Sequence, residues 1–300
     1  MGGLFMKKFM RQAGYFLIII MLLPYVVTVF VNGNGILKLE EADSPYITVE
    51  RDGGTKEMSL NEYGIGVLAK EIDADSEMET LKAQAILIRT SIYKTLQEEG
   101  TNTVLKKNYW TRNQMETNWE SETYLEKYNK MKEAWESTKD IVLIYEGNLA
   151  LTPYHKLSNG KTRSGNEVFG SESYPYLQVK ECPKDLEAKE AVTTSIIQET
   201  DLQVLERDSA GYVTKVKCGT EEIKGEEFRS TYHLISSSFE LENFDGNTKV
   251  TTKGIGHGLG MSQYTAEIMA KDGKNYHEIL NYFFEGTSFG EVAEILVKPE

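Results

Sequence analysis

Short stretches of strand-like and helix-like hydrophobic pattern follow one another along the chain. Residues 46–60, YITVERDGGTKEMSL, form two alternating runs on either side of a glycine pair, which is typical of a β-hairpin. Apolar residues at helical spacing then predict a helix over residues 61–71. After a polar break at residues 73–76, a second helix is expected to run to about Leu96. Its apolar residues cover nearly every side, so this helix should be buried.

The middle of the chain mixes both patterns. Residues 110–139 are charged and aromatic with helical character, and residues 141–155 predict two strands around Gly147 and Asn148. Residues 158–185 are rich in Gly, Ser and Pro and predict a long loop region. Short strands are expected within residues 196–225.

The last third continues in the same way. A new segment begins at residues 228–232, and strands follow to Val250. Ser262 is expected to cap a helix that ends before Gly273. A second helix over residues 275–284 and a last strand over 291–297 complete the pattern. Because strands and helices alternate without a βαβ rhythm, we predict an α+β fold whose short strands and helices form a groove.

The N-terminus carries a different signal. Residues 14–31 are an uncharged, apolar run of 18 residues, preceded by Lys7, Lys8 and Arg11. This length lies near the lower limit for a membrane-spanning helix, and the basic residues place its N-terminal side in the cytoplasm. No clear cleavage site follows, so an uncleaved signal anchor is favoured over a removed signal peptide or a buried helix.

This interpretation divides the chain into three parts. Residues 1–31 would be a cytoplasmic stub and transmembrane anchor, 32–45 a linker, and 46–300 an extracytoplasmic domain. The whole chain has 300 residues and a net charge of −13, and no acidic residue precedes Glu40. The part beyond the anchor is therefore even more acidic, at about −16. This acidity and the lack of a basic patch argue against nucleic acid as a partner.

One acidic residue in the buried helix attracts attention. Glu79, Lys82 and Arg89 fall within about 80° of one another on the helix surface. Ser76 and Glu79 also have the spacing of a capping box, in which Lys82 would be an ordinary partner three residues further on. From this stretch alone, Glu79 could be a cap, a surface carboxylate or a catalytic acid.

A second candidate site is the glycine-rich stretch GIGHGLGMSQY at residues 254–264. Alternate glycines leave the backbone open to a close ligand, and His257 stands between two of them. Ser262, Gln263 and Tyr264 follow with hydrogen-bonding groups suited to sugar hydroxyls. The stretch lacks the Gly-Lys-Ser/Thr of a phosphate loop and the spacing of a dinucleotide fingerprint. The alternative is a tight turn in which His257 is exposed and has no role.

Metal and disulfide signals are weak. Cys182 and Cys218 could form a disulfide or remain free thiols, and the sequence does not decide between them. There is no Cys-x-x-Cys pair. His155, His233 and His277 are isolated along the chain, which favours structural or surface roles.

Three blocks together resemble the stage II sporulation protein D family. They are LNEYGIGVLAKEIDADSEMETLKAQAILIRTSIY, SNGKTRSGNEVFGSESYPYLQVKECPKD and GIGHGLGMSQYTAEIMAKDGKNYHEILNYFFEGT. They are similar to the family patterns LEEYV-GVVA-EMP…EALKAQA, S-GG-T…PYL-V-D and GYGHGVGMSQYGA, and they occur in the family's order. The likeness extends over residues 47–297. Gly160 stands where a glycine pair is common, and Thr265 replaces a glycine.

The resemblance implies a lytic transglycosylase of peptidoglycan that acts during forespore engulfment. Such an enzyme cuts peptide-stripped glycan between N-acetylmuramic acid and N-acetylglucosamine and leaves 1,6-anhydro ends. It also implies two partners, an amidase (stage II sporulation protein P) and a membrane scaffold (stage II sporulation protein M). Some clostridial relatives bind zinc, but this chain has no cysteine in the loop before Cys182, so no metal or other cofactor is predicted. The alternative is a non-catalytic peptidoglycan-binding or scaffold module.

The family's catalytic glutamate falls on Glu79. One carboxyl group would first protonate the leaving O4 and then take the proton from O6. Such an acid must be protonated near pH 7, so we expect burial to raise the pKa of Glu79. Lys82 and Arg89 would then face other carboxylates or the substrate. The expected substrate-binding residues come from all three blocks: Lys82, Gln84, Arg89, Ser158, Gly160, Thr162, Tyr176, His257, Gly258, Ser262, Gln263 and Tyr264.

Overall fold

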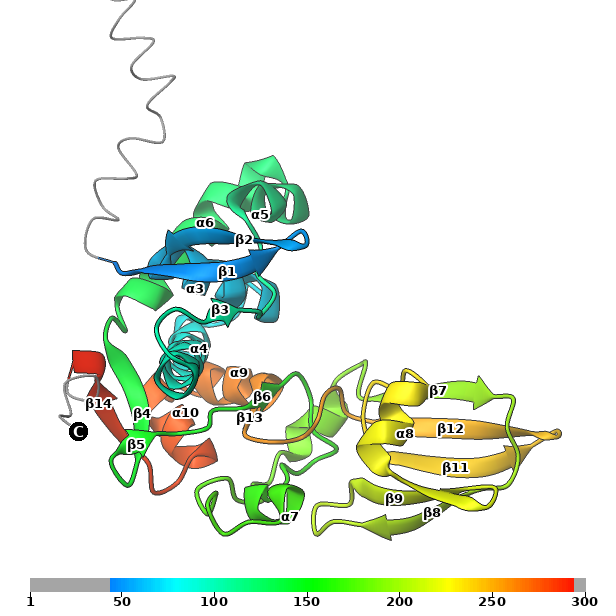
Figure 1. Ribbon diagram of the computed structural model, residues 1–300. Coiled ribbons are helices and arrows are strands. Elements are labelled where there is room, and N and C mark those ends of the chain that lie inside the picture. The colour runs from blue at the N-terminus through cyan, green and yellow to red at the C-terminus, as the bar shows by residue number, and fades with distance from the viewer. Residues whose placement is uncertain (1–43, 294–300) are drawn as a thin grey trace, which may run out of the picture. The chain divides into compact units, whose positions relative to one another are not determined.

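The computed structural model describes residues 44–293 (Figure 1). The chain divides into two compact units, of which the second, residues 47–58 and 62–300, carries the candidate sites. The predicted anchor and nearly all of the predicted linker lie outside the described residues. Within residues 44–293, no helix has both the length and the apolar character needed to cross a membrane.

The predicted N-terminal hairpin is confirmed. Strands β1 (Tyr46–Arg51) and β2 (Gly54–Ser59) pair, and β3 (Val104–Leu105) extends their sheet in the order β2-β1-β3. Asp52 and Gly53 at the turn have φ of 50° and 78°. Two positive φ values in a two-residue turn match the twist of the flanking strands.

Helix α4 (Met78–Glu99) is at the centre of the main hydrophobic core. It follows α3 (Leu60–Glu71) and contacts α6 (Ser121–Glu136), α9 (Gln263–Lys271) and α10 (Tyr276–Phe283). Its buried positions run from Thr80 to Tyr93, and Leu81, Ile86, Leu87 and Ile88 are completely buried. Burying each such side chain contributes about 1.5–3 kcal/mol, which explains why the helix is apolar on nearly every side.

Short strands surround this helical core. Strands β4 (Ile141–Tyr145), β5 (Asn148–Leu149) and β14 (Ser288–Glu291) form one sheet in the order β14-β4-β5. Strand β6 (Tyr154–His155) pairs in parallel with β13 (Met261–Ser262). The remaining helices before residue 192 are α5 (Arg112–Trp119), α7 (Gly165–Phe169) and the 3-10 helix η1 (Pro183–Glu187).

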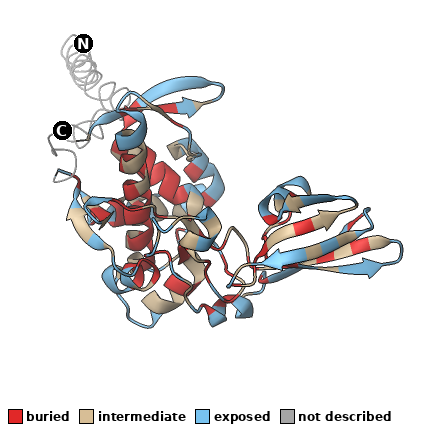
Figure 2. Cartoon of the chain, turned by 60° about the horizontal axis from the view of Figure 1, so that its bottom comes forward, coloured by how far each residue is buried: buried red, intermediate tan, exposed pale blue. Residues whose placement is uncertain are grey.

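Residues 192–253 form two further three-stranded sheets around a second hydrophobic cluster. Their orders are β10-β9-β8 and β11-β12-β7. Val213, Phe228 and Val250 lie in the cluster and are completely buried. Figure 2 shows buried residues concentrated along the helices of the main core, whereas most positions of these strands are exposed or intermediate and only a few are buried. The elements are β7 (Val192–Ile197), β8 (Leu202–Arg207), β9 (Val213–Cys218), β10 (Glu221–Lys224), α8 (Gly225–Thr231), β11 (Phe239–Phe244) and β12 (Asn247–Lys253).

The α+β class and most elements agree with the sequence predictions, with two differences. Helix α4 begins after Glu77, so Ser76 is not its N-cap. The last strand is Ser288–Glu291, earlier than predicted, and residues 294–297 of the predicted strand lie outside the described part of the chain. The helix predicted to start at Ser262 is confirmed, because the Ser262 hydroxyl accepts a hydrogen bond from the Thr265 amide.

Candidate functional site

A cavity of about 320 Å³ lies where the first and third sequence blocks meet. Ser76 in the α3–α4 connection and Gln263 and Tyr264 at the start of α9 contribute to its wall. Both acidic and basic side chains stand at its edge. The full lining is Ile72, Asp73, Asp75, Ser76, Lys156, Gln263, Tyr264, Glu267 and Lys271.

The glycine-rich loop needs its glycines for close packing. Gly258 and Gly260 have φ of 78° and 68°, a region that L-residues with a side chain rarely adopt. A Cβ on Gly260 would lie 2.0 Å from the carbonyl oxygen of Pro153, and one on Gly258 would lie 2.4 Å from the Tyr212 ring. This close approach lets β13 pair with β6 and brings Ser262 beside His155.

Two histidines lie side by side at this loop, with ring centroids 5.9 Å apart. The Leu259 amide donates to His257 Nδ1 at 3.1 Å, so the neutral ring carries its proton on Nε2. Burial lowers the pKa of His257 to about 4, and the positive charge of Arg229 adds to this effect. His257 is therefore neutral near pH 7 and is half-buried, so it does not have the exposed position that the alternative gave it.

His155 carries its proton on the other ring nitrogen, Nδ1. Its Nδ1 contacts the Leu259 carbonyl oxygen at 3.0 Å, so Nδ1 carries the proton and Nε2 is an acceptor. Burial, with a contribution from His257, lowers the His155 pKa to about 3. His155 Nε2 is buried and has no hydrogen-bond partner among the described residues.

Asp185 ties the second and third blocks together. Its carboxylate is completely buried and accepts hydrogen bonds from the Ser158 amide, the Ser262 hydroxyl and the Thr265 hydroxyl, all at 2.6–2.7 Å. Thr265, which stands where the family has a glycine, thus has a defined partner. Ser158 and Ser262 are completely buried, so both hold the framework of the site and neither is at a surface that a glycan can contact.

Three other predicted substrate-binding residues also prove to be framework residues. The Thr162 hydroxyl donates to the Gln178 carbonyl oxygen, and the Tyr176 hydroxyl accepts from the Leu151 amide. Gly160 is buried with φ of 102° and accepts from the Cys182 amide. These residues shape the second block, but their burial corrects the expectation that they contact substrate. Gly258 is buried as well.

Gln263 connects the first and third blocks directly. Its side-chain amide donates to the Glu71 carbonyl oxygen at 2.9 Å and to Gln84 Oε1 at 3.1 Å. Gln84 is completely buried, so it positions Gln263 and does not reach the surface. Gln263 and Tyr264 are only half-buried and line the cavity, in agreement with a binding role.

Glu71 is a candidate that the sequence interpretation missed. It is the last residue of α3, and its half-buried carboxylate lies close enough to the Tyr154 hydroxyl to add to the rise in the pKa of Tyr154 that burial causes. Lys107 Nζ in turn donates to the Tyr154 oxygen, and its charge interacts with Glu71. A signal was present, because the family pattern of the first block has a glutamate at this position.

Glu79 faces another part of the structure. Lys82 Nζ lies 2.7 Å from Glu79 Oε1, and the Tyr276 amide at the start of α10 donates to Glu79 Oε2 at 2.9 Å. Burial alone would raise the Glu79 pKa, but the hydrogen bonds from Lys82 and the Tyr276 amide, with the charges of Lys82 and His277, outweigh it. The net shift is downward.

These contacts correct two expectations about Glu79. Its carboxylate does not cap its own helix, because the N-cap of α4 is Glu77 and makes no side-chain capping hydrogen bond within the described part. Its pKa is lowered where the proposed chemistry called for a raised value, since Lys82 pairs with Glu79 itself. The assignment of Glu79 as the catalytic residue stays a prediction.

Arg89 is a core residue. It is 3% exposed, and its guanidinium donates to the carbonyl oxygens of Trp135 and Thr138 at 2.7 and 2.6 Å. These carbonyls lie at the C-terminal end of α6, where a cation satisfies otherwise unpaired groups. Burial lowers the Arg89 pKa to about 10. Arg89 therefore anchors α6 to α4 and is not placed to bind substrate.

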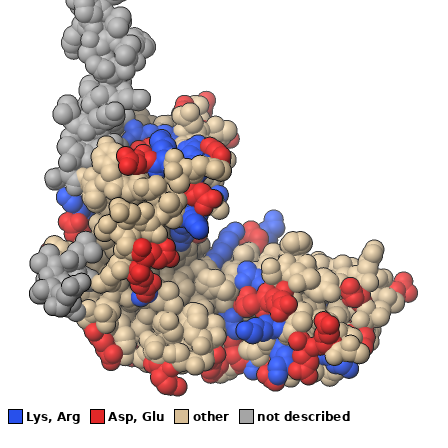
Figure 3. Space-filling view, in the orientation of Figure 1, with Lys and Arg blue, Asp and Glu red and all other residues tan. Residues whose placement is uncertain are grey.

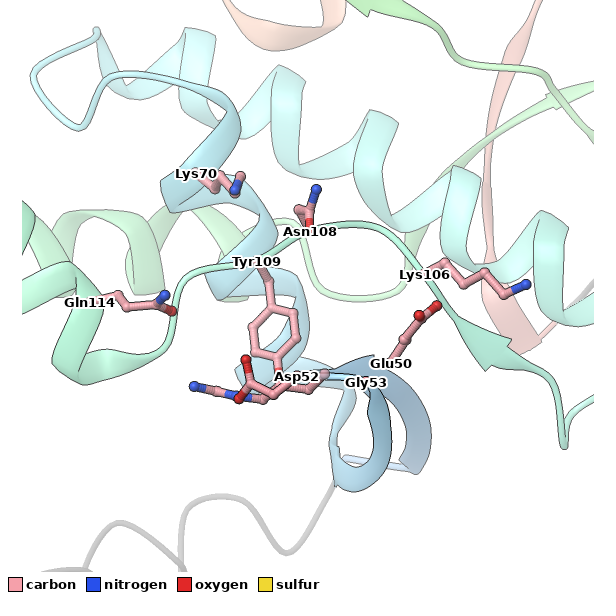
Figure 4. A pocket seen from close by; sticks show the side chains of 9 residues that line it. Glu50, Asp52, Gly53, Lys70, Lys106, Asn108, Tyr109 and Gln114 are labelled. Carbon is pink, nitrogen blue, oxygen red and sulfur yellow. The ribbon is translucent and has the colours of Figure 1, made fainter.

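A second cavity of about 320 Å³ lies between the hairpin turn and the connection from β3 to α5. Figure 4 shows Lys70, Lys106, Asn108 and Tyr109 at this cavity, from α3 and the β3–α5 connection. Acidic and basic residues are interspersed on the face shown in Figure 3. Both cysteines are free thiols, and residues 44–293 contain no group of three or more His, Cys, Asp or Glu residues placed to hold a metal ion.

Comparisons with known proteins agree with the motifs. Residues 51–145 match the SpoIID family profile, "Stage II sporulation protein". The stage II sporulation protein D of Bacillus amyloliquefaciens and that of Bacillus subtilis (strain 168) are each 29% identical over 264 residues, covering 80% of this chain and 76% of the relative. A Bacillus subtilis (strain 168) protein named amidase enhancer is 29% identical over 297 residues, covering 74% of this chain and 39% of the relative. The resemblance predicted from the three sequence blocks is confirmed: residues 51–145 match the SpoIID profile, and the likeness to stage II sporulation protein D extends over 80% of the chain.

Proposed function

We propose that this protein is a lytic transglycosylase that cleaves peptidoglycan glycan strands between N-acetylmuramic acid and N-acetylglucosamine to give 1,6-anhydro ends. The observation that carries the proposal is the convergence of the first and third motif blocks on one cavity, through Gln263 and Glu71. Asp185 of the second block fixes the start of α9 by accepting hydrogen bonds from the Ser262 and Thr265 hydroxyls. Three distant segments are thus used to build one site.

The chemistry of this site suits a neutral sugar chain. Gln263 and Tyr264 offer amide and hydroxyl groups at the cavity. His257 lies outside the lining of this cavity, in the glycine-rich loop that precedes Gln263 and Tyr264, and it is neutral with its proton on Nε2. A few oriented polar groups in a concave site are typical of small-molecule and glycan recognition.

Location and partners follow from the same proposal. The apolar residues 14–31 would anchor the chain, and the SpoIID domain would face the cell wall. A sporulation amidase and a membrane scaffold, stage II sporulation proteins P and M, would be its partners during engulfment. The name of one relative, amidase enhancer, supports the proposal that this protein acts together with an amidase.

The test is glycan cleavage by the purified protein. Wild-type protein in detergent is incubated with peptide-stripped glycan, and the new chain ends are identified by mass spectrometry. We expect 1,6-anhydro ends to accumulate, because the sugar's own O6 replaces water as the nucleophile. Reducing ends in their place would show a hydrolase, which needs a second carboxylate and a water molecule.

The alternative is a peptidoglycan-binding module without activity. It would retain glycan in a pull-down and release no new ends over a range of pH. Loss of retention on changing Gln263 to Ala, with no cleavage by wild type, would favour this alternative.

A further inference from the structure

We propose that two copies of this chain associate through strand β7, which pairs with itself in antiparallel direction about a two-fold axis at Thr194. The strand lies outside the three motif blocks, and the proposed function assigns it no role. The inference is therefore independent of glycan cleavage and can be tested without it.

Strand β7 is an open edge of its sheet. In the order β11-β12-β7 it pairs with β12 on one side, and within residues 44–293 no strand pairs with it on the other side. Figure 1 shows β7 at one edge of the strands of residues 192–253, and its residues from Val192 to Ile196 are all exposed. Natural edge strands are commonly protected by a charge, a proline or a bulge. The sequence VTTSII contains no charged residue and no proline, and its ladder with β12 has no bulge.

The free backbone groups of this edge belong to alternate residues. The Gly254 amide donates to the Ala191 carbonyl oxygen at 2.7 Å, which makes these two residues a hydrogen-bonded pair in line with the β7–β12 ladder. In an antiparallel ladder, every second residue from there continues such pairs, and the residues between them direct their N–H and C=O groups to the opposite side. Val192, Thr194 and Ile196 therefore present their backbone groups at the open edge.

The side chains of the same residues form an apolar row along this edge. Val192 and Ile196 are 51% and 50% exposed, although both are aliphatic. Their neighbours on β12 are lysines that already form ion pairs with glutamates of β11, at 2.9 and 3.0 Å. The outer face of the sheet thus has neutralised charges on β11 and β12 and uncovered apolar side chains on β7.

Pairing of β7 with a second β7 satisfies these groups together. With Thr194 opposite Thr194 of the second copy, Val192 faces Ile196 of the second copy and Ile196 faces its Val192. Each of these facing pairs can exchange two backbone hydrogen bonds, and the aliphatic side chains meet on one face. A shift of one residue would place backbone groups that already bond β12 opposite the free ones. A shift of two residues would place Val192 opposite the polar Gln198, or Ile196 opposite the charged Glu190.

The charges beyond the strand ends favour a second copy as the occupant. Lys189 precedes β7 and Glu199 follows it, both are exposed, and neither forms an ion pair with another described residue. The same register directs Lys189 of each copy toward Glu199 of the other, and Glu190 toward the uncharged Gln198. A two-fold axis repeats this attraction at both ends of the pair.

The first experiment tests the position of the axis by disulfide formation in the full-length protein in detergent. Cys218→Ser removes the partly exposed thiol, and Thr194→Cys is added in this background. Facing residues of a hydrogen-bonded antiparallel pair have Cα atoms about 5.5 Å apart, which is within the range of a disulfide. We expect a disulfide-linked dimer on a non-reducing gel after mild oxidation. Ser195→Cys is the matched control and should give several-fold less dimer, because it is equally exposed but its two copies are offset along the strands.

A proline separates association from folding. Thr194→Pro removes an N–H that points away from β12, so the melting temperature should stay close to that of wild type. The same change should abolish the concentration-dependent dimer that we expect for wild type in analytical ultracentrifugation. Val192→Lys, which puts a charge on the apolar row, is the second variant if Thr194→Pro lowers the melting temperature. Glu206→Gln, an exposed position of β8, is the control and should dimerise as wild type does.

Charge exchange identifies the occupant. Lys189→Glu and Glu199→Lys each place like charges at both ends of the pair, so each variant alone should dimerise more weakly than wild type. A mixture of the two variants has opposite charges at both ends again. We expect the mixture to recover the lost association, as a contact between two copies requires.

Three results would overturn the inference. One is wild type that stays monomeric at every concentration, whether its edge is bare or is taken by a strand of another protein. Another is a dimer that survives both Thr194→Pro and Val192→Lys, since the two copies would then meet elsewhere. The last is equal disulfide formation by Thr194→Cys and Ser195→Cys, which random collisions would give. None of these results bears on glycan cleavage, so the proposed function is tested separately.

Discussion

At the scale of single residues, the environment of a carboxylate decides what it can do. Glu71 and Glu79 are both half-buried glutamates near helix ends. Glu79 is held by an ammonium group and a helix N-terminal amide, which stabilise its charge, whereas Glu71 lies near the neutral Tyr154 hydroxyl. The residue type is the same at both positions, so this difference in partners needs the three-dimensional structure.

Changing Lys82 to Met should raise the pKa of Glu79. Burial already favours the neutral carboxyl, and without Lys82 only the Tyr276 amide and the more distant His277 charge oppose it. We expect the Glu79 titration, followed by carbon-13 NMR of the carboxyl group, to move upward. Lys82→Arg keeps the cation and is the control. An unchanged titration in Lys82→Met would show that the ion pair does not form in solution.

The same contacts predict how stability depends on pH. Because the folded-state pKa of Glu79 is lowered from 4.5, its contribution is present above this value and is lost as the pH falls through the folded-state pKa. The free energy of unfolding of wild type, relative to Glu79→Gln, should therefore decrease on acidification below about pH 4.5. A difference that stays constant over this range would contradict the lowered pKa.

At the scale of elements, the glycine-rich loop is the most demanding part of the fold. Gly260→Ala should destabilise the protein by more than about 3 kcal/mol, since left-handed φ costs about 1–2 kcal/mol and the clash with the Pro153 oxygen adds to it. Gly273→Ala is a close control: its φ is 85°, but its Cβ meets no described atom within 4 Å. Urea unfolding measures the difference. Equal losses for both variants would mean that only φ matters and that the close β6–β13 approach is relaxed in solution.

The sequence predicted elements well where a local pattern determined them. The hairpin at Asp52 and Gly53, the buried helix α4 and the Ser262 cap all follow from neighbours within a few residues. It failed where a distant partner decides. Ser76 fits a capping box, but the Glu79 carboxylate that would complete the box is held by the Tyr276 amide, 197 positions further along the chain.

The candidate site divides in the same way. Gln263 and Tyr264 were predicted and line the cavity. Ser158 and Ser262 were predicted to contact substrate but are buried against Asp185, because a motif marks residues needed for the framework as well as those that touch a ligand. Glu71 matches a glutamate of the family pattern, but its neighbours Tyr154 and Lys107 are far along the chain, and Lys107 lies in a stretch without any recognisable motif.

At the scale of the whole molecule, the two cysteines belong to separate cores. Cys182 is completely buried in the main cluster around α4, and Cys218 packs against the cluster of residues 192–253. Both are free thiols, so the disulfide that the sequence left open is absent from this structure. The framework depends instead on polar links such as Arg163, which is 4% exposed and bonds Asp208 at 2.6 Å and Glu226 at 2.8 Å.

The two thiols should therefore react very differently with a maleimide. Burial raises the Cys182 pKa to about 12, and Cys182 is inaccessible, whereas Cys218 is partly exposed and its pKa is raised too. Because the thiolate is the reactive form, we expect Cys218 to be labelled slowly and Cys182 only on unfolding. Cys218→Ser, with the single remaining thiol, is the control and should show no labelling until denaturant is added. Fast labelling of Cys182 in the native protein would mean that the main core opens without global unfolding. A disulfide between Cys182 and Cys218 under mild oxidation would mean that the two thiols can approach each other in the folded protein.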